Sequence, residues 1–350
     1  MSSVVNVVIH ASQFPVNVRR DLLESLRARR VNHKFHYDSV KQTQKWLALH
    51  QEYSPSRHDA DCRDIYETGF KAAAAQIKAK SVHVIGLGCG GGQKDTQLLK
   101  LLKARGREIF YTPCDVSAAM VLVARRTALA VVPEKNCFPF VCDLATAGDL
   151  RDVLEEVGPR CRAALDDRQV VPTHCVRLLT FFGMIPNFEP QIILPKLASL
   201  IRKNDFLLFS ANLAPGNNYA AGMKKVLPQY DNPLTRDWLM TFLLDLGVGR
   251  NDGKLVFEIK NGPAGSGLKR IVARFHFKRA CRIEIESEKF NFRAGESIRL
   301  FFSYRYTPER VCKVLARFDL EVCDQWIAKS EEEAVFLCRN SEGRALRVPD

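Results

Sequence analysis

The chain carries the stretch Val82-His-Val-Ile-Gly-Leu-Gly-Cys-Gly-Gly-Gly92, in which a short apolar run meets a glycine-rich turn. The apolar run predicts a buried strand over Val82–Leu87, and the leucines between Leu98 and Leu102 predict a helix after the turn. Glycine lets the backbone approach a ligand closely and adopt positive φ without a Cβ clash. The turn therefore predicts a nucleoside-binding loop, with a plain tight turn as the alternative.

Past this turn, short apolar runs alternate with helical patterns, which is typical of a parallel α/β sheet. Four further strands are predicted, at Ile109–Pro113, Phe138–Val141, Val176–Phe181 and Phe206–Ser210. The helices predicted between them are Ser117–Leu129, Leu150–Val157 and Ile192–Ile201. In such a sheet a ligand binds beyond the carboxyl ends of the strands.

After Ser210 the alternation stops, and an insertion rich in Asn, Gly and Pro follows. Its predicted elements are a helix over Trp238–Leu246 and strands over Lys254–Lys260, Arg270–Phe277 and Ile298–Ser303. A helix capped by Thr307 and two strands, Leu320–Trp326 and Ala334–Cys338, close the chain. We therefore predict an α/β fold with a doubly wound sheet formed by residues 62–213 and 304–350. A second, smaller substrate-binding domain is predicted from the N-terminal arm, residues 1–61, and the insertion, residues 214–303.

Two acidic residues follow the next two predicted strands. Asp115 ends the second strand, where a carboxylate can accept both ribose hydroxyls of either NAD or S-adenosylmethionine (SAM). Asp143 ends the third strand, where an acid reads the adenine amino group in SAM enzymes. Each acid has the alternative of being a helix N-cap. The three strand ends together favour SAM over NAD.

Several short motifs extend this interpretation across the chain. They are His36-Tyr37-Asp38, Glu52-Tyr-Ser-Pro-Ser-Arg57, Gly88 with Lys94, Asp115-Val-Ser117, Phe182-Gly-Met-Ile-Pro-Asn-Phe188, Tyr230-Asp231 and Ser303. In these motifs, from about residue 17 to residue 340, the chain resembles the histidine-specific SAM-dependent methyltransferase family. This family includes the histidine Nα-methyltransferase of ergothioneine biosynthesis and fungal N-methyltransferases of dimethylallyltryptophan. The resemblance implies a Rossmann-like class I methyltransferase sheet, with the last two strands as its closing hairpin.

The resemblance also implies site residues. The cofactor side comprises Tyr37, Gly86, Gly88, Gly90, Lys94, Asp115, Asp143 and Leu144. The substrate side comprises Tyr53, Asn187, Tyr230, Phe301 and Ser303. Taken singly, the tyrosines have the alternative of being core residues with a satisfied hydroxyl. No strong general base is evident, so no catalytic residue is assigned.

The chain departs from the family at positions that bear on its substrate. Histidine-specific members have a Glu that accepts from the imidazole two residues before the serine, where this chain has Phe301. With the small Ala273 nearby, this predicts an apolar, roomier pocket. The predicted reaction is therefore N-methylation of the α-amino group of an aromatic or modified amino acid rather than of free histidine. The alternative is that Phe301 is plain strand packing.

Other departures concern the cofactor loop and the Asn motif. Gly86 stands where the family has an acid, Pro186 stands where it has a glycine, and the polar segment Asp166–Thr173 is longer than expected. Each of these changes indicates an altered substrate or a lost activity.

Composition leaves two other functions open. The formal net charge of +13 keeps an RNA or protein methyltransferase as an alternative, although no aromatic residues interleave the basic stretches. The second alternative function is a protein that binds SAM without catalysing a reaction. The 11 cysteines are scattered without Cys-x-x-Cys, and His33 and His36 have no acidic or Cys partner nearby, so we expect no metal. Without an apolar run of about 20 residues or a signal peptide, we expect a cytoplasmic protein.

Overall fold

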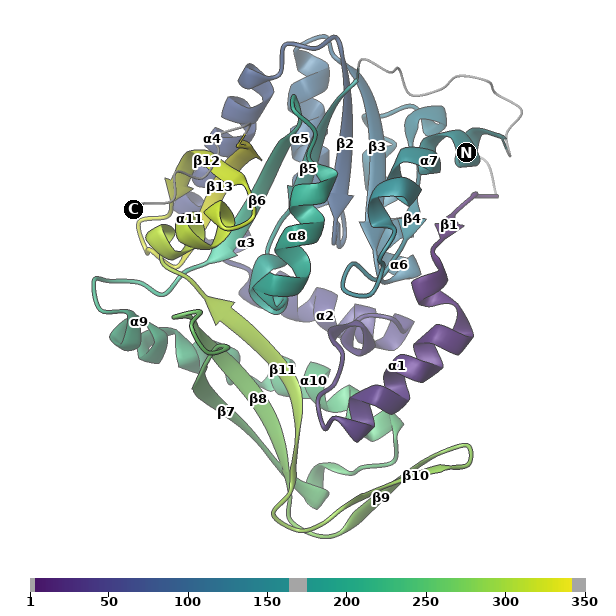
Figure 1. Cartoon of the computed structure of the whole chain (residues 1–350), viewed down its shortest axis with the longest axis vertical. Coiled ribbons are helices and arrows are strands. Elements are labelled where there is room, and N and C mark those ends of the chain that lie inside the picture. Colours follow the sequence, from purple (N-terminus) through teal and green to yellow (C-terminus); the bar gives the residue numbers. More distant parts are fainter. Residues whose placement is uncertain (1–3, 164–174, 342–350) are drawn as a thin grey trace, which may run out of the picture.

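The computed structural model describes residues 4–163 and 175–341, which form a large mixed sheet, a small antiparallel sheet and a separate hairpin (Figure 1). The large sheet has the strand order β1-β4-β3-β2-β5-β6-β13-β12. Strands β1 to β6 pair in parallel, whereas β13 is antiparallel to both of its neighbours. The strands are β1 Val8–Ile9, β2 Ser81–Leu87, β3 Glu108–Asp115, β4 Phe140–Val141, β5 Val176–Phe181, β6 Phe206–Asn212, β12 Leu320–Ile327 and β13 Glu333–Asn340. The predicted doubly wound α/β sheet with a closing hairpin is confirmed.

Two layers of helices cover this sheet, because its central strands are apolar on both faces. One layer packs against the front of the sheet in Figure 1, and the other lies behind it. The front layer consists of α7 Leu150–Ala163, α8 Pro190–Leu200 and α11 Pro308–Ala316. The rear layer consists of α4 Ala60–Gln76, α5 Gln93–Ala104 and α6 Ala118–Ala128. The topology reverses between β2 and β5, so a crevice is expected at the carboxyl ends of these strands.

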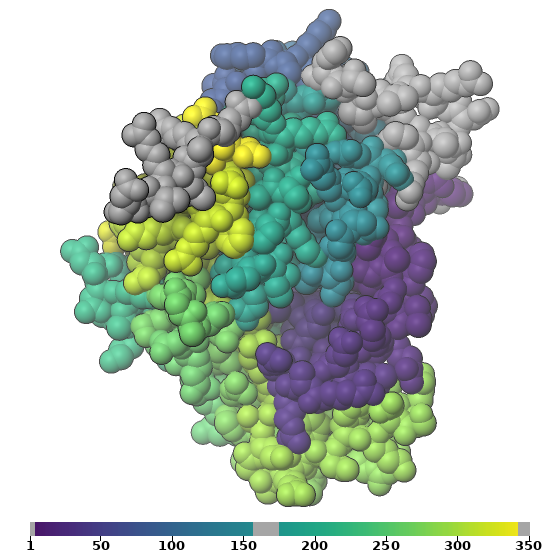
Figure 2. Space-filling view, viewed as in Figure 1, coloured from purple at the N-terminus to yellow at the C-terminus, as the bar shows by residue number. Residues whose placement is uncertain are grey.

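The small sheet and the N-terminal arm share a second core below this edge. The sheet contains β7 Gly253–Asn261, β8 Lys269–Phe277 and β11 Ser297–Arg305, and the hairpin contains β9 Cys281–Ile285 and β10 Glu288–Phe292. The helices around them are α1 Pro15–Arg27, α2 Val40–Tyr53, α3 Pro55–His58, α9 Tyr219–Val226 and α10 Pro233–Asp245. Figure 2 shows the purple N-terminal arm between the large sheet and the yellow-green hairpin region. The division into two domains stays a prediction, since β1 from the arm pairs with β4 of the large sheet.

Sequence patterns located most elements of the large sheet but not the helices of the N-terminal arm. Helix α4 of the large sheet was also missed, although its buried residues recur at helical spacing from Cys62 to Ala74. Helix α1 begins at Pro15 after Phe14, whose side chain makes no capping hydrogen bond. The hairpin β9–β10 was also not predicted. Strand β1, which the N-terminal arm adds to the large sheet, contains only two residues. The polar segment Asp166–Thr173 lies outside the described residues.

In residues 4–163 and 175–341, no helix combines the length and the apolar character that a membrane crossing requires. The same residues contain no group of three or more His, Cys, Asp or Glu side chains that could hold a metal ion.

His36 packs in the second core and makes stability depend on pH. Its ring contacts Trp238, its Nε2 donates to the Leu300 carbonyl at 2.7 Å, and its Nδ1 is buried without a hydrogen-bond partner among the described residues. Burial lowers the pKa of His36 from 6.5 to about 4.

We therefore expect His36 to destabilise the fold as the pH falls below 6.5. The unfolded chain then binds a proton that the folded chain does not, so the free energy of unfolding decreases down to the folded-state pKa. At pH 5 the loss from this residue is about 2 kcal/mol. Thermal unfolding from pH 7 to pH 5 would measure it: the melting temperature of His36→Phe should fall less steeply than that of the wild type. Parallel curves would contradict the prediction.

Candidate active site

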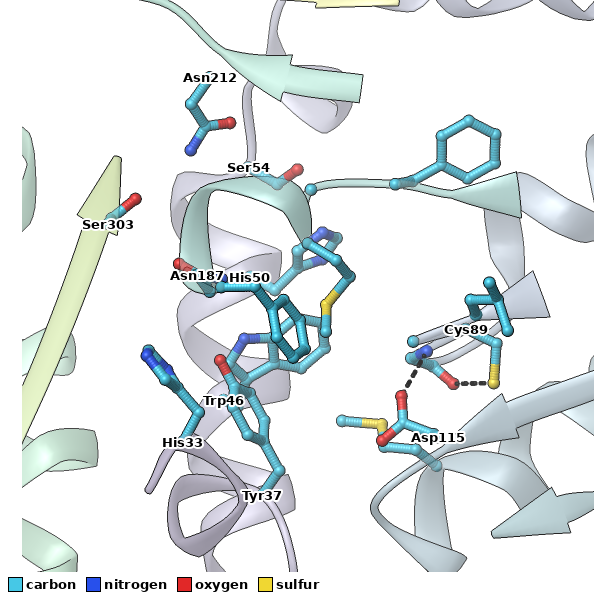
Figure 3. A pocket seen from close by; sticks show the side chains of 18 of the residues that line it. His33, Tyr37, Trp46, His50, Ser54, Cys89, Asp115, Asn187, Asn212 and Ser303 are labelled. Atoms are coloured by element: carbon cyan, nitrogen blue, oxygen red, sulfur yellow. Dashed lines mark hydrogen bonds between the residues drawn. The ribbon is translucent and has the colours of Figure 1, made fainter. Parts of the chain in front are cut away.

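A large cavity lies at the carboxyl ends of the central strands and extends to the small sheet. Its volume is about 1520 Å³, more than the roughly 300–1,000 Å³ that one small ligand usually needs, so it has room for two molecules. In Figure 3, Cys89 and Asp115 lie on one side of the cavity, and His33 and Ser303 lie on the other. Asn187 and Tyr37 lie between them.

The glycine turn after β2 forms one wall. Gly88 has φ of 64°, a left-handed conformation that favours glycine, and both Gly88 and Gly90 line the cavity. A Cβ atom on Gly88 would lie 2.7 Å from the side chain of Met184, which covers this glycine. The Gly90 N–H donates to Asp115 Oδ2 at 3.0 Å, so the turn is bound to the end of β3. The turn is thus more than a link between strand and helix, because its backbone is exposed to the cavity.

Gly86 differs from the other predicted glycines because it does not line the cavity. A Cβ atom on Gly86 would lie 2.1 Å from Asp95 Oδ2, so the glycine makes room for this carboxylate. Asp95 lines the cavity and accepts hydrogen bonds from Tyr111 and Thr180, both at 2.7 Å. Burial raises its pKa to about 6. A carboxylate from α5 therefore fills the space that an acid at position 86 would occupy. Because Gly86 does not line the cavity, nothing in the structure supports the predicted contact between Gly86 and the cofactor.

The two strand-end acids both line the cavity and are buried. Asp115 accepts from the backbone N–H of Ser117 and of Gly90, both at 3.0 Å, and burial raises its pKa. The N-cap of α6 is Ser117 and not Asp115, so the capping alternative is wrong for Asp115. Asp143 Oδ1 accepts from the Ala145 N–H at 2.9 Å, while its Oδ2 is buried without a hydrogen-bond partner among the described residues. That oxygen is available for a donor on a ligand.

Lys94, predicted on the cofactor side, belongs to a buried polar cluster. Its Nζ donates to the Tyr66 hydroxyl at 2.7 Å and lies 3.9 Å from Glu333 Oε1. Tyr66 donates to Glu333 and also contacts Ser210 Oγ at 2.7 Å. Burial lowers the pKa of Lys94 and raises that of Tyr66. Lys94, Tyr66 and Glu333 all line the cavity, so they place a cation and its partners beside the glycine turn.

The predicted substrate-side residues also line the cavity. They are Tyr53, Asn187, Tyr230, Phe301 and Ser303, and the cofactor-side residues Tyr37 and Leu144 line the cavity too. The Tyr230 hydroxyl donates to Ser303 Oγ at 3.0 Å and accepts from Arg305 Nε at 2.9 Å. Asn187 lies at the end of a short helix, Ile185–Asn187, which begins directly after Met184. The structure brings these residues together from six separate elements and connections.

The environment of Phe301 is aromatic. Its ring makes edge-to-face contacts with Trp238 at 5.7 Å and with His33 at 5.5 Å between centroids, and Tyr230 lies at 6.4 Å. Ala273 pairs with Phe301 across the sheet but is fully buried and does not line the cavity, so the expectation that it enlarges the pocket is wrong. Phe301 lines the cavity, so it is not strand packing alone.

Sequence reasoning missed several cavity residues. Tyr66, Asp95, Glu333 and Trp46 line the cavity, and His33 does so although it was considered only as a metal ligand. Lys34 also lines it, with its Nζ paired to Asp21 and 3.7 Å from Asp143 Oδ2. The available signal for Lys34 was its place as the only Lys, Arg, Asp or Glu between Val31 and Tyr37. Glu333 follows two other glutamates, so the sequence gives no signal for it.

Comparison with known proteins gives the family. Residues 18–218 and 266–340 match the family described as histidine-specific methyltransferase, SAM-dependent. The chain belongs to this family. It is a SAM-dependent methyltransferase, and SAM is its cofactor.

The individual relatives share little sequence identity with this chain. The N-methyltransferase imqF of Aspergillus flavus is 22% identical over 284 residues, which cover 79% of this chain and 71% of imqF. Among solved structures, magnesium protoporphyrin IX methyltransferase (ChlM) of Synechocystis PCC 6803, with bound SAH, is 12% identical with a TM-score of 0.43. That match covers 88% of this chain and 98% of ChlM.

The residues of the cavity fit the cofactor of the family. Asp143 Oδ2, a buried acceptor without a hydrogen-bond partner in the described part, matches the adenine amino group of SAM. Asp115 places a carboxylate beside the glycine turn, where ribose hydroxyls can donate to it. We expect the Lys94 ammonium group to attract the carboxylate of the methionine part of SAM, because Lys94 lines the cavity directly after the glycine turn. These individual roles stay predictions.

Proposed function

We propose that this methyltransferase transfers a methyl group to the α-amino group of an amino acid with an aromatic or modified side chain, and not to free histidine. Family membership and the name of the fungal relative, an N-methyltransferase, support transfer to nitrogen. The observation that carries the choice of substrate is Phe301, which lines the cavity among aromatic rings. Phe301 and Trp238 make this part of the wall apolar.

An apolar wall disfavours histidine for an energetic reason. An imidazole N–H that faces a phenyl ring has no strong acceptor, and a buried unpaired donor costs about 1–3 kcal/mol. That corresponds to roughly 5- to 150-fold in affinity. A flat aromatic side chain instead gains dispersion contacts and edge-to-face geometry against Phe301 and Trp238.

The remaining residues bind and orient the substrate. Bound SAM supplies an already activated methyl group, so the protein mainly has to hold an amine in line with it. The Asn187 carboxamide is neutral and can accept from an amine while donating to a carboxylate. Ser303 Oγ accepts from Tyr230 and keeps its own proton for a substrate oxygen. A free α-amine has a pKa near ~8, so binding must favour its neutral form.

The proposal is tested with purified protein, SAM and a panel of amino acids. The panel contains tryptophan, tyrosine, phenylalanine and histidine, and mass spectrometry measures each gain of one methyl group. Fragmentation of the product distinguishes the α-nitrogen from a ring nitrogen. We expect Nα-methylated aromatic amino acids at rates at least ten-fold above that of histidine. Preference for histidine, or a methyl group on the ring, would contradict the proposal.

Two further measurements separate the alternatives: activity and affinity on RNA and protein, and binding of SAM without turnover. Methylation of RNA or protein with affinity that falls steeply with salt would support an enzyme that uses the basic surface. SAM binding without turnover of any substrate would indicate a binding protein without catalysis.

A further inference from the structure

His33 is a cavity residue whose polar atoms are left unused by the rest of the protein. It begins the short helix His33–His36, and its imidazole lines the cavity. Both ring nitrogens are buried, and neither has a hydrogen-bond partner within the part of the chain that the structure describes. Buried polar groups are nearly always paired, so two unpaired nitrogens on one cavity residue point to a missing partner.

The His33 ring packs against two phenylalanines that also line the cavity. It makes edge-to-face contacts with Phe301 at 5.5 Å and Phe302 at 4.7 Å between centroids. Figure 3 shows His33 on the side of the cavity that carries Ser303, with Asn187 and Tyr37 between it and Asp115. An α-amine that reacts beside the cofactor would therefore lie nearer to Asn187, and the end of the side chain would lie nearer to His33.

The chemical state of His33 decides what it can do. Burial, with smaller contributions from His36 and Arg299, lowers its pKa to about 3. Taking a proton from an ammonium group with a pKa near ~8 would be unfavourable by about 10⁵-fold, so His33 is not suited to act as the base. A neutral imidazole has one N–H donor and one nitrogen acceptor. His33 is therefore a hydrogen-bonding group.

We propose that His33 is a specificity-determining residue that hydrogen-bonds to the polar edge of an aromatic substrate side chain, an indole N–H or a phenol O–H. This inference rests on the proposed function, and it names which aromatic substrates the pocket accepts. Phe301 and Phe302 provide the apolar walls, and His33 provides the one acceptor that these walls lack. An imidazole side chain has two polar nitrogens, so His33 would pair one of them and the apolar walls would leave the other unpaired. Phenylalanine would fill the same space but would leave both nitrogens of His33 unpaired.

The expected effect is selectivity among substrates of similar size. A site built to pair a substrate donor discriminates against the analogue that lacks it, because the buried partner is left unsatisfied. We expect kcat/KM for the preferred indole or phenol amino acid to exceed that for phenylalanine by about 10- to 100-fold.

The test compares three variants on tryptophan, tyrosine, phenylalanine and histidine. His33→Phe should remove the selectivity over phenylalanine, while His33→Gln, which keeps a donor and an acceptor, should restore part of it. His36→Phe is the matched control: His36 is a neighbouring buried histidine that does not line the cavity, so its replacement should leave the selectivity unchanged. Melting temperatures show whether each variant is folded, and His33→Phe should not be less stable, since it removes an unpaired polar group.

Binding supplies a readout that does not depend on turnover. Titration calorimetry measures each amino acid against protein saturated with SAH, and the same 10- to 100-fold ratio is expected in Kd. If aromatic amino acids are bound and methylated but His33→Phe keeps the wild-type ratio, the role of His33 is overturned while the proposed function stands. If histidine binds most tightly, or if no aromatic amino acid binds or reacts, both are overturned.

Discussion

Replacement of Lys34 by methionine should lower the free energy of unfolding by about 3 kcal/mol and the melting temperature by roughly 6 °C. Lys34 and Asp21 form an ion pair in which the side chains are only 1% and 5% exposed, and Lys34 Nζ also lies 3.7 Å from Asp143 Oδ2. Removal of the Lys34 ammonium group leaves the buried carboxylates of Asp21 and Asp143 without this positive charge. A buried charge without a partner is among the largest destabilising effects of a single substitution. Arg20 still contacts Asp21, which limits the loss.

The matched control is Lys41→Met, since Lys41 and Asp245 form an ion pair whose side chains are 54% and 42% exposed. Exposed pairs contribute about 0–1 kcal/mol, so this variant should melt within about 2 °C of the wild type. The double variant Lys34→Met/Asp21→Leu should recover part of the loss, because it also removes one of the two stranded carboxylates. Equal melting temperatures for Lys34→Met and Lys41→Met would show that the buried pair does not stabilise the fold.

Asp115→Asn should weaken SAM binding by about 100-fold while the protein remains folded. The two carboxylate oxygens of Asp115 accept from Ser117 and Gly90 N–H groups, and we expect ribose hydroxyls to donate to the same oxygens. An amide has only one oxygen, so its NH₂ group would face one of these N–H donors and the turn would lose that bond. Each hydrogen bond to a charged group contributes about 1.5–3 kcal/mol, which sets the expected size.

Titration calorimetry with SAM and with SAH measures the effect, and circular dichroism confirms that the variant is folded. Asp245→Asn, a change of the same type outside the cavity, should leave both dissociation constants within about two-fold. A change below three-fold in Asp115→Asn would show that this carboxylate does not hold the cofactor.

Patterns of neighbouring residues determined the large sheet. The apolar run before the glycine turn, the alternation of strands and helices, and the acids at the ends of β3 and β4 were all readable, because a buried strand, an amphipathic helix and a turn each depend on residues close in the chain. The resemblance to the family added the cofactor and the residues on the substrate side. Helices α1 and α4 were missed, although Val18, Leu22 and Leu26 of α1 and the buried residues of α4 recur at helical spacing.

Only the tertiary structure decided which charges and polar atoms share the cavity. Nothing in the sequence indicates that Asp95 occupies the space beside Gly86, that Glu333 near the end of the chain meets Tyr66 and Lys94, or that Lys34 reaches Asp143. The unpaired nitrogens of His33 likewise become visible only when Phe301 and Phe302 are placed around them. Secondary structure follows from local periodicity, whereas burial and pairing of polar groups depend on contacts between residues up to hundreds of positions apart. The sequence by itself therefore determined the sheet and its cofactor loop, and the folded chain decided the substrate wall.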